Sequence, residues 1–445
     1  MPSFKEPVII VGAGAFGLST AWHLCKAGYT DITVLERGSD IPSPYSAAND
    51  LNKIIRAEYE DPFYRDLALE AINSWRQPLF APHYHQTGYI LATSSQAPKK
   101  SIDSLAKYLA VLQGHQAFAN EISLLNSPDD FRRYAWQLSG PMRGFKGYFN
   151  RIAGYAHSSN AIHSLFLVCV RMGIKFITGE QHGNVVELLY EPGDSQRQTK
   201  SKQCVGVKTA DGKKHFSRLN VLALGAFGAS LIPELGAFAT ARSWSVAHIQ
   251  LSVEEAESLR GIPVVNIRDL GFFFEPDPKT RLLKLCHLGA GFTNTNANGV
   301  SLPPGNFEPS DFMPGADEKK LRTLLREVLP ELADRPFVNK KLCWFSDTAT
   351  SDFCIDFVPG SNSSLVVLAG DSGHGFKMVP IFGEWVVKLL ENGNQKIERW
   401  QWPKRLADAS KEQKQWGNNI SWRVGEEKEL SDLIADEKAV FKSNI

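Results

Sequence analysis

The chain has 445 residues, of which 43% are hydrophobic and 22% charged, and its formal net charge is +1. This length exceeds a single core and predicts two or three domains, and the even charge balance gives no sign of a nucleic-acid surface. No apolar run is long enough to span a bilayer, and the six cysteines include no C-x-x-C pair that would indicate a metal site.

The two ends of the sequence carry no recognisable address signal. An apolar strand begins at residue 8 without a preceding signal peptide. The final residues, 443–445, are Ser-Asn-Ile and do not form the peroxisomal Ser-Lys-Leu. We therefore expect a cytoplasmic location.

The first predicted elements form a dinucleotide-binding unit. Residues 8–11 predict a buried strand, 12–17 read G-x-G-x-x-G, and 15–27 predict the helix that follows. These glycines let a pyrophosphate approach backbone N–H groups at the helix N-terminus. Glu36 ends a second strand at 32–36, nineteen residues after Gly17, where a carboxylate can bind the adenosine ribose. This context makes the motif specific.

The middle of the chain mixes predicted helices and strands. Apolar spacing predicts helices over 61–76, 101–113 and 160–172, and residues 126–150 are expected to be irregular. Strands are predicted at 175–177, 184–190, 203–209 and 220–224. The last of these ends in Gly225 and is expected to return the chain to the first sheet.

The second half of the chain predicts a separate antiparallel sheet. Strand-like runs alternate over 244–287 around a helix at 253–259, a long loop follows at 289–316, and an amphipathic helix is predicted at 317–332. A second glycine-rich segment follows the strand 365–369 and ends in a lysine. Its glycines again allow close backbone approach. We expect both ends of the chain to meet one cofactor.

Four segments resemble the fungal-type sarcosine oxidase and amadoriase (fructosyl amino acid oxidase) family of FAD-dependent amine oxidases. They are the fingerprint at 8–17, Asn-Asp-Leu-Asn-Lys-Ile-Ile-Arg at 49–56, Leu-Cys-Trp-Phe-Ser-Asp-Thr at 342–348, and the glycine-rich residues 370–377. The resemblance extends from residue 8 to about residue 402.

The resemblance implies an α/β fold with a discontinuous architecture. A Rossmann-like FAD-binding domain, DAO/glutathione-reductase-like, is expected over 1–87, 150–230 and 335–400. A mainly antiparallel α+β substrate domain is expected over 88–149 and 231–334. Residues 401–445 are expected to pack on the surface as a tail.

The cofactor implied by the resemblance is FAD, bound covalently through its 8α-methyl group to Cys343. Outside this context, a buried structural role is the commoner fate of a free cysteine. The expected cofactor-binding residues are Gly12, Gly14, Ala15, Phe16, Gly17, Glu36, Arg37, Lys53, Val186, Gly225, Cys343, Asp347, Gly373, Gly375, Phe376 and Lys377.

The resemblance also assigns basic residues to catalysis and substrate binding. Lys284 and Lys53 are expected to act as catalytic lysines, Lys284 beside the flavin ring, where a buried cation promotes reaction with O2. From its strand context alone, Lys284 would be read as an exposed residue. Arg56 and Lys377 match the arginine and lysine with which the sarcosine oxidase branch binds a substrate carboxylate.

Amadoriases share residues 49–54 but usually lack the arginine found here at Arg56. They use an arginine from a C-terminal Trp-Arg-Trp-Arg-Pro segment, in which this chain has Gln401. They also carry Asp-Glu where this chain has His287 and Leu288. These departures disfavour a fructosyl substrate. His287 and Phe272 are candidate substrate contacts, with a buried strand histidine and core packing as the alternatives.

The function implied is oxidation of a secondary amine of an amino acid, of the N-methyl, pipecolate or saccharopine type, with hydride transfer to FAD and reduction of O2 to hydrogen peroxide. The small-molecule substrate and O2 are the expected partners of a monomer, without nucleic acid, membrane or metal. A fructosyl amino acid oxidase is the alternative. A pyridine-nucleotide dehydrogenase and a catalytically silent flavoprotein are further possibilities, and Arg56 and Lys377 argue against the latter.

Overall fold

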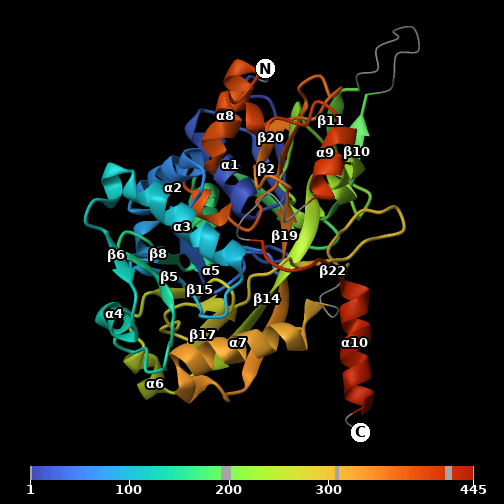
Figure 1. Ribbon diagram of the computed structural model, residues 1–445. Coiled ribbons are helices and arrows are strands. Elements are labelled where there is room, and N and C mark those ends of the chain that lie inside the picture. The colour runs from blue at the N-terminus through green and yellow to red at the C-terminus, as the bar shows by residue number, and fades with distance from the viewer. Residues whose placement is uncertain (1–2, 192–201, 306–309, 416–422, 444–445) are drawn as a thin grey trace.

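A six-stranded, mainly parallel sheet organises the upper part of the fold in Figure 1. The computed structural model describes residues 3–191, 202–305, 310–415 and 423–443. Within them, five strands of this sheet run parallel and β20 pairs antiparallel with β21. In sheet order the strands are β20 (Cys354–Phe357), β21 (Leu365–Ala369), β13 (Leu219–Leu222), β1 (Val8–Val11), β2 (Ile32–Glu36) and β9 (Lys175–Thr178).

Helices pack around this sheet through buried apolar side chains. Helix α1 (Ala15–Lys26) contacts both α8 (Phe382–Asn392) and α5 (Ser158–Arg171). Helix α2 (Pro62–Trp75) starts with a proline in its first turn, and the Asp61 side chain accepts a hydrogen bond from the Phe63 N–H. Such a cap satisfies one of the free N–H groups at a helix start.

A ten-stranded sheet forms the lower part of the fold and mixes antiparallel with parallel pairs (Figure 1). Helix α7 (Gly315–Val328) packs against it through buried leucines. Strand β14 has partners on both sides, because it pairs with β17 and with β19. The strands are β22 (Lys428–Glu429), β18 (Phe292–Thr293), β14 (Thr240–Gln250), β17 (Leu282–Cys286), β16 (Gly271–Phe273), β15 (Val264–Ile267), β5 (Tyr89–Thr93), β7 (Lys146–Asn150), β6 (Ile122–Leu125) and β19 (Phe337–Asp347).

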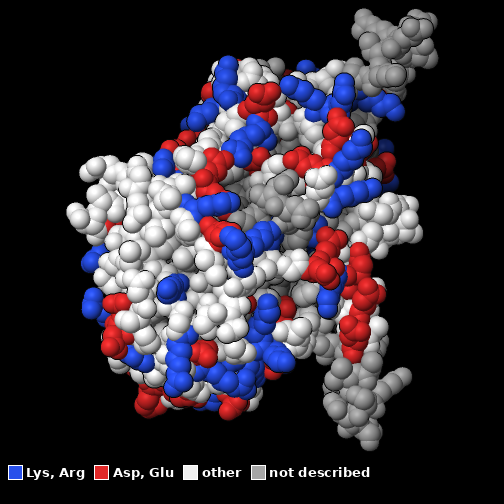
Figure 2. Space-filling model, viewed as in Figure 1, with Lys and Arg blue, Asp and Glu red and all other residues white. Residues whose placement is uncertain are grey.

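Two small sheets complete the described strands. One consists of β3 (Lys53–Ile55), β8 (Gly154–Ala156) and β4 (Tyr84–His85), and the other of β10 (Val185–Tyr190), β11 (Cys204–Thr209) and β12 (Lys214–Phe216). The remaining α-helices are α3 (Lys99–Gln113), α4 (Pro128–Tyr134), α6 (Val253–Ser258), α9 (Leu406–Gln413) and α10 (Leu430–Ser443). Basic and acidic side chains are interspersed on the face shown in Figure 2.

The structure confirms the α/β fold and most predicted elements. The helices expected at 15–27, 61–76, 101–113 and 160–172 are α1, α2, α3 and α5, each within about two residues of its expected bounds. The expectation that 126–150 is irregular was wrong, because α4 and β7 lie there. A capping box between Ser127 and Asp130 starts α4. The sequence Ser-Pro-Asp-Asp is typical of a helix start. The helix was missed because it is too short to show a clear apolar period.

The domain boundaries stay a prediction, and the strands of the six-stranded sheet can be compared with the segments expected for the FAD-binding domain. The six-stranded sheet takes its strands from 1–87, 150–230 and 335–400, the three segments expected for the FAD-binding domain. Strand β19 also lies in the third segment, yet it pairs with β14 of the other large sheet. In the C-terminal tail, Arg423 is 1% exposed. No helix in the described ranges has the length and apolarity to cross a membrane.

Candidate active site

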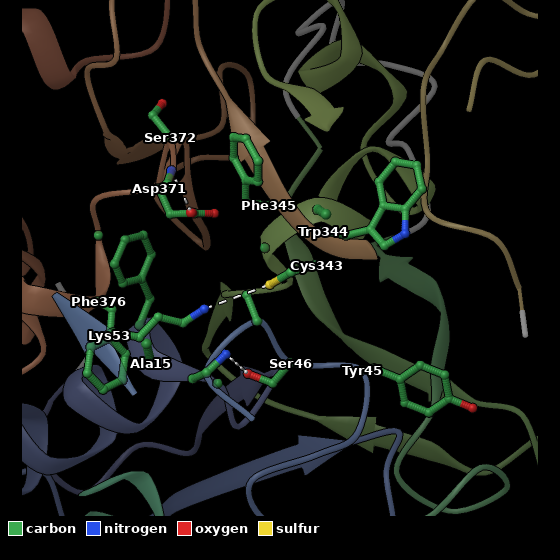
Figure 3. Close-up of a pocket in the computed structure, with 18 of the residues that line it drawn as sticks. Ala15, Tyr45, Ser46, Lys53, Cys343, Trp344, Phe345, Asp371, Ser372 and Phe376 are labelled. Atoms are coloured by element: carbon green, nitrogen blue, oxygen red, sulfur yellow. Dashed lines mark hydrogen bonds between the residues drawn. The ribbon is translucent and has the colours of Figure 1, made fainter. Parts of the chain in front are cut away.

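One pocket is lined by both glycine-rich segments and by strands of both large sheets (Figure 3). Two segments that lie far apart in the sequence therefore meet at one site. The predicted site residues that line it are Gly12, Gly14, Ala15, Phe16, Glu36, Arg37, Lys53, Arg56, Gly225, Phe272, Lys284, Cys343, Gly373, Gly375, Phe376 and Lys377.

Glycines shape the end of the pocket formed by β1 and α1. Gly12 has φ +102°, and a Cβ there would lie 2.4 Å from the carbonyl oxygen of Ala223. A Cβ on Gly17 would lie 1.8 Å from the carbonyl oxygen of Gly12. Gly17 does not line the pocket and instead lets α1 pack closely on the preceding turn.

The Glu36 carboxylate holds this turn together from the end of β2. One of its oxygens accepts from the Ala13 N–H and the other from the Gly38 N–H, both at 2.9 Å. Because a carboxylate has about four acceptor sites, it still has acceptor capacity toward the pocket. The Arg37 guanidinium lies 3.4 Å from the ring centroid of Tyr45, and one of its terminal nitrogens is buried without a hydrogen-bond partner. These groups fit the ADP half of a dinucleotide, with donors for phosphate and acceptors for ribose.

A buried carboxylate between two lysines forms the middle of the site. Asp50 Oδ2 lies 2.5 Å from Lys284 Nζ and 2.8 Å from Lys53 Nζ. Burial alone would raise the pKa of Asp50, but the lysines outweigh it and hold that pKa below its usual value. Burial likewise opposes charge on Lys53, yet Asp50 and the Cys343 sulfur raise its pKa above the usual value. Both charges persist at neutral pH.

Lys53 connects this ion pair to Cys343. Its Nζ lies 3.8 Å from the Cys343 sulfur, and the two side chains point toward each other in Figure 3. Strand pairing explains how Lys284 reaches the same place. Residue 284 pairs with His248 and Cys343 with Trp244, so both flank β14 from opposite sides.

Arg56 and Lys377 place two cations in the wall of one pocket region. Arg56 donates to the backbone carbonyl of Glu58, and its guanidinium lies 5.2 Å from the Tyr59 ring centroid. Lys377 Nζ lies 5.2 Å from the same centroid and is buried. Burial and the neighbouring Arg56 hold the pKa of Lys377 well below its usual value, whereas burial raises the pKa of Glu58. Arg56 therefore gives the region a positive charge, and a bound anion would favour the charged form of Lys377.

Besides Gly17, three predicted residues lie outside the pocket lining. Val186 is 50% exposed and its neighbour Val185 lines the pocket instead, because successive strand residues point to opposite faces. Asp347 is fully buried in an ion pair with Arg423 and lies 3.3 Å from Arg242 Nε. His287 donates from Nδ1 to the carbonyl oxygen of Leu270 at 3.1 Å. In the structure, Val186 is therefore an exposed strand residue, Asp347 is part of a buried ion pair, and His287 is a buried histidine bonded to the backbone.

Other residues of the site escaped the sequence reasoning. Tyr59 contacts both Lys377 and His374, and no motif marks it. Asp371 lines the pocket, and burial raises its pKa to about 6. Asn266 and Arg268 also line the pocket. Their alternation with apolar Val265 and Ile267 was a period-two signal that could have found them.

The pocket and fold define a dinucleotide-dependent oxidoreductase, and comparison with known proteins agrees. The profile of the family described as FAD dependent oxidoreductase (DAO) matches residues 7–389. The chain belongs to this family. FAD is therefore its cofactor, and the expectation of a flavin enzyme from the sarcosine oxidase and amadoriase relatives is confirmed.

Three proteins show what this chain is similar to within and around this family. L-saccharopine oxidase of Schizosaccharomyces pombe is 32% identical over 412 residues, which are 89% of this chain and 93% of the relative. Monomeric sarcosine oxidase of a Bacillus species is 24% identical over 394 residues, 87% of this chain and 92% of the relative. The crystal structure of fructosamine oxidase (Amadoriase II) from Aspergillus fumigatus superposes with a TM-score of 0.83 at 32% identity and covers 97% of both chains.

Proposed function

We propose that this enzyme oxidises a secondary amine of an amino acid and transfers the electrons to O2. The single observation that carries the proposal is the pair of cations, Arg56 and Lys377, in the wall of the FAD pocket. The relatives named L-saccharopine oxidase and monomeric sarcosine oxidase support an amino acid amine as substrate.

The two cations bind the substrate carboxylate. Arg56 has five N–H donors and uses one on the Glu58 carbonyl, so a pair remains for two-point binding of a carboxylate. Lys377 supplies a second charge, and its backbone carbonyl accepts from Trp75 Nε1 at 2.8 Å, which holds the residue in place. Anchoring the carboxylate orients the C–H bond next to the amine.

The protein also controls the proton on the substrate amine, which must be neutral for hydride loss. Arg56, Lys377, Lys53 and Lys284 all line the pocket. Positive charge close to an amine lowers its pKa, because the ammonium form is disfavoured. The pocket therefore favours the deprotonated amine.

FAD, when bound, accepts the hydride and passes the electrons to O2. Gly12, Gly14, Glu36 and Arg37 would hold its ADP half, with the 370–377 segment and Cys343 near the ring half. Lys284, which forms an ion pair with Asp50, is the residue that favours electron transfer to O2. The proposal includes a covalent bond from the FAD 8α-methyl group to Cys343, whose sulfur lies 3.8 Å from Lys53 Nζ. The C–S bond would replace the S–H bond and one methyl C–H bond, and the two electrons released would leave through the flavin to O2.

Fructosyl amino acids are the second candidate substrates, and the close superposition on Amadoriase II favours them. Two features of the site disfavour a fructosyl substrate. Leu288 lines the pocket where the resemblance would place a carboxylate, and Arg399 is engaged by Asp61 and by Asp352 at 2.7 Å, outside the pocket lining.

Hydrogen peroxide release on a substrate panel tests the proposal. The panel holds sarcosine, pipecolate and saccharopine on one side and fructosyl-valine and fructosyl-lysine on the other. We expect at least one member of the first group to be oxidised far faster than either fructosyl compound. The reverse order would establish the amadoriase activity, and no turnover of either group would reject amine oxidation. Size-exclusion chromatography and cell fractionation test the monomeric state and cytoplasmic location that belong to the same proposal.

A further inference from the structure

Arg268 is a buried cation in the pocket wall that has no anionic partner among the described residues. It is 6% exposed, and it lines the same pocket as Arg56. Its Nε is buried without a hydrogen-bond partner, and no carboxylate of the described chain lies in ion-pair range. Its guanidinium lies 5.3 Å from the centroid of the Tyr108 ring. A buried, uncompensated charge is costly, so such a residue indicates a ligand.

Asn266 presents an unused acceptor beside it. Its side chain is 97% buried, Nδ2 donates to the Tyr89 hydroxyl at 2.9 Å, and Oδ1 has no partner. With Nδ2 bonded to Tyr89, the atom left free is the oxygen. Residues 266 and 268 are two apart along β15 and its end, which places both on one face of the sheet.

The surroundings of this pair are positively charged. Arg56 lies 5.8 Å from the centroid of the same Tyr108 ring that Arg268 contacts. The Lys100 pKa is lowered by burial, by Arg423 and by Arg268 and is raised by Glu60, so Lys100 has both cationic and anionic neighbours. The Glu58 carboxylate is bonded to Asn150 Nδ2 at 2.7 Å and faces Arg56. An anion brought in with the ligand would balance this excess charge.

We propose that Arg268 and Asn266 form a second substrate subsite, in which Arg268 binds a carboxylate other than the one held by Arg56 and Lys377. Asn266 Oδ1 accepts an N–H or ammonium group of the same end of the substrate. This inference rests on the proposed function and deepens it. It selects, among secondary amines, those whose two N-substituents both carry carboxylates, such as saccharopine, over N-methyl and cyclic monocarboxylates.

A single carboxylate-binding site would also account for the positions of these arginines, and the experiment must distinguish it from a second subsite. Both arginines border the Tyr108 ring, so they could share one carboxylate as a single clamp. In that case, removal of Arg268 would weaken every substrate equally. In a separate subsite, it weakens only substrates with a second carboxylate.

The experiment measures kcat/KM for saccharopine and for pipecolate in the wild type, Arg268→Met, Arg268→Lys and Asn266→Leu. We expect Arg268→Met to lower kcat/KM for saccharopine by about 10- to 100-fold, the effect of one charged hydrogen bond, and to leave pipecolate within about threefold. Arg268→Lys should recover part of the loss. The exposed Arg326→Met on α7 is the control and should change neither value.

A binding measurement keeps the test independent of turnover. Glutarate and acetate are compared as ligands by calorimetry. Wild-type enzyme should bind the dicarboxylate at least about tenfold more tightly, and Arg268→Met should remove this difference. Equal losses for both substrates, or equal binding of both acids by the wild type, would overturn the subsite. Failure of every secondary amine to be oxidised would instead reject the proposed function.

Discussion

Lys377 Nζ donates a hydrogen bond of 2.8 Å to the Tyr59 hydroxyl, although 318 positions separate the two residues. The Tyr59 hydroxyl in turn faces His374 Nδ1 at 2.9 Å. His374 Nε2 faces the Ser351 carbonyl oxygen at 2.8 Å and must donate to it, so Nδ1 is the acceptor. Tyr59 therefore donates to His374 and accepts from Lys377, which fixes the direction of the whole chain of bonds.

The first prediction concerns Tyr59 as a positioning residue. Tyr59→Phe removes one of the two acceptors of Lys377 Nζ, leaves the His374 carbonyl as the other, and keeps the rings in contact. We expect KM for the amino acid substrate to rise by about tenfold, the effect of one lost hydrogen bond to a charged group, with kcat changed less. Steady-state kinetics on the best substrate measure both constants, and the absorbance spectrum of bound FAD serves as the control for the fold. An unchanged KM would contradict the role.

The second prediction is a pH dependence that belongs to Lys377. Its pKa in the free enzyme is held well below the usual lysine value by burial and by Arg56. The cation is present below that pKa and is lost as the pH rises through it. Substrate affinity should therefore fall on the alkaline side, measured as KM against pH. Lys377→Arg keeps its charge across this range and should flatten that limb. An alkaline limb that persists unchanged in Lys377→Arg would assign the titration to another group.

The third prediction uses two glycines of one motif. Gly17→Ala forces a Cβ to within 1.8 Å of the Gly12 carbonyl oxygen, whereas Gly14→Ala meets only Ser46 Oγ at 3.3 Å. Overpacking of this kind costs about 1–3 kcal/mol or more. We expect Gly17→Ala to lower the melting temperature by several degrees, measured with excess FAD, and Gly14→Ala to change it little. Equal melting temperatures for the two variants would contradict the packing role of Gly17.

The parts of the site that depend on short spacings could be predicted from the sequence. Gly12, Gly14 and Glu36 lie within one β-α-β unit, where the spacing determines which backbone and side-chain groups meet. Lys284 is different, since strand alternation alone made it an exposed residue. It is buried in an ion pair with Asp50, which lies in the loop before β3.

The residues that the sequence did not reveal depend on long-range pairing or on strand phase. Tyr59 meets partners more than 300 positions away, which no local pattern encodes. The Val186 side chain is exposed and that of Val185 lines the pocket, because successive side chains of a strand point to opposite faces. Asp347 belongs to the segment 342–348 that resembles the family, but in the structure it is buried in an ion pair with Arg423. Its partner lies in a tail whose sequence indicated only a charged surface segment.

The fourth prediction compares Lys284 with Lys53 in the reaction of the reduced enzyme with O2. Both lysines contact Asp50, so removal of either one leaves this carboxylate paired with the other lysine. Lys284→Met should slow the reaction of the anaerobically reduced enzyme with O2 by about 100-fold, because a preorganised cation is lost where negative charge develops. Reduction by the substrate should change much less. Stopped-flow absorbance separates the two half-reactions, and Lys53→Met is the matched variant. An O2 reaction of Lys284→Met at the wild-type rate would remove Lys284 from this role.

The last prediction concerns Cys343 and the covalent attachment of FAD. After acid precipitation of the wild type, we expect the yellow colour to stay with the polypeptide, and after precipitation of Cys343→Ser to appear in the supernatant. Lys53 lies 3.8 Å from the sulfur, and the thiolate is the form of cysteine that attacks. Lys53→Met should therefore slow attachment when apoprotein is mixed with FAD, followed as the fraction of precipitable flavin over time. Cys286→Ser is the control, because this buried cysteine lines the same pocket and burial raises its pKa to about 11. Colour that washes out of the wild type would reject the covalent bond and leave FAD binding in place, whereas loss of attachment in Cys286→Ser alone would move the bond to that sulfur.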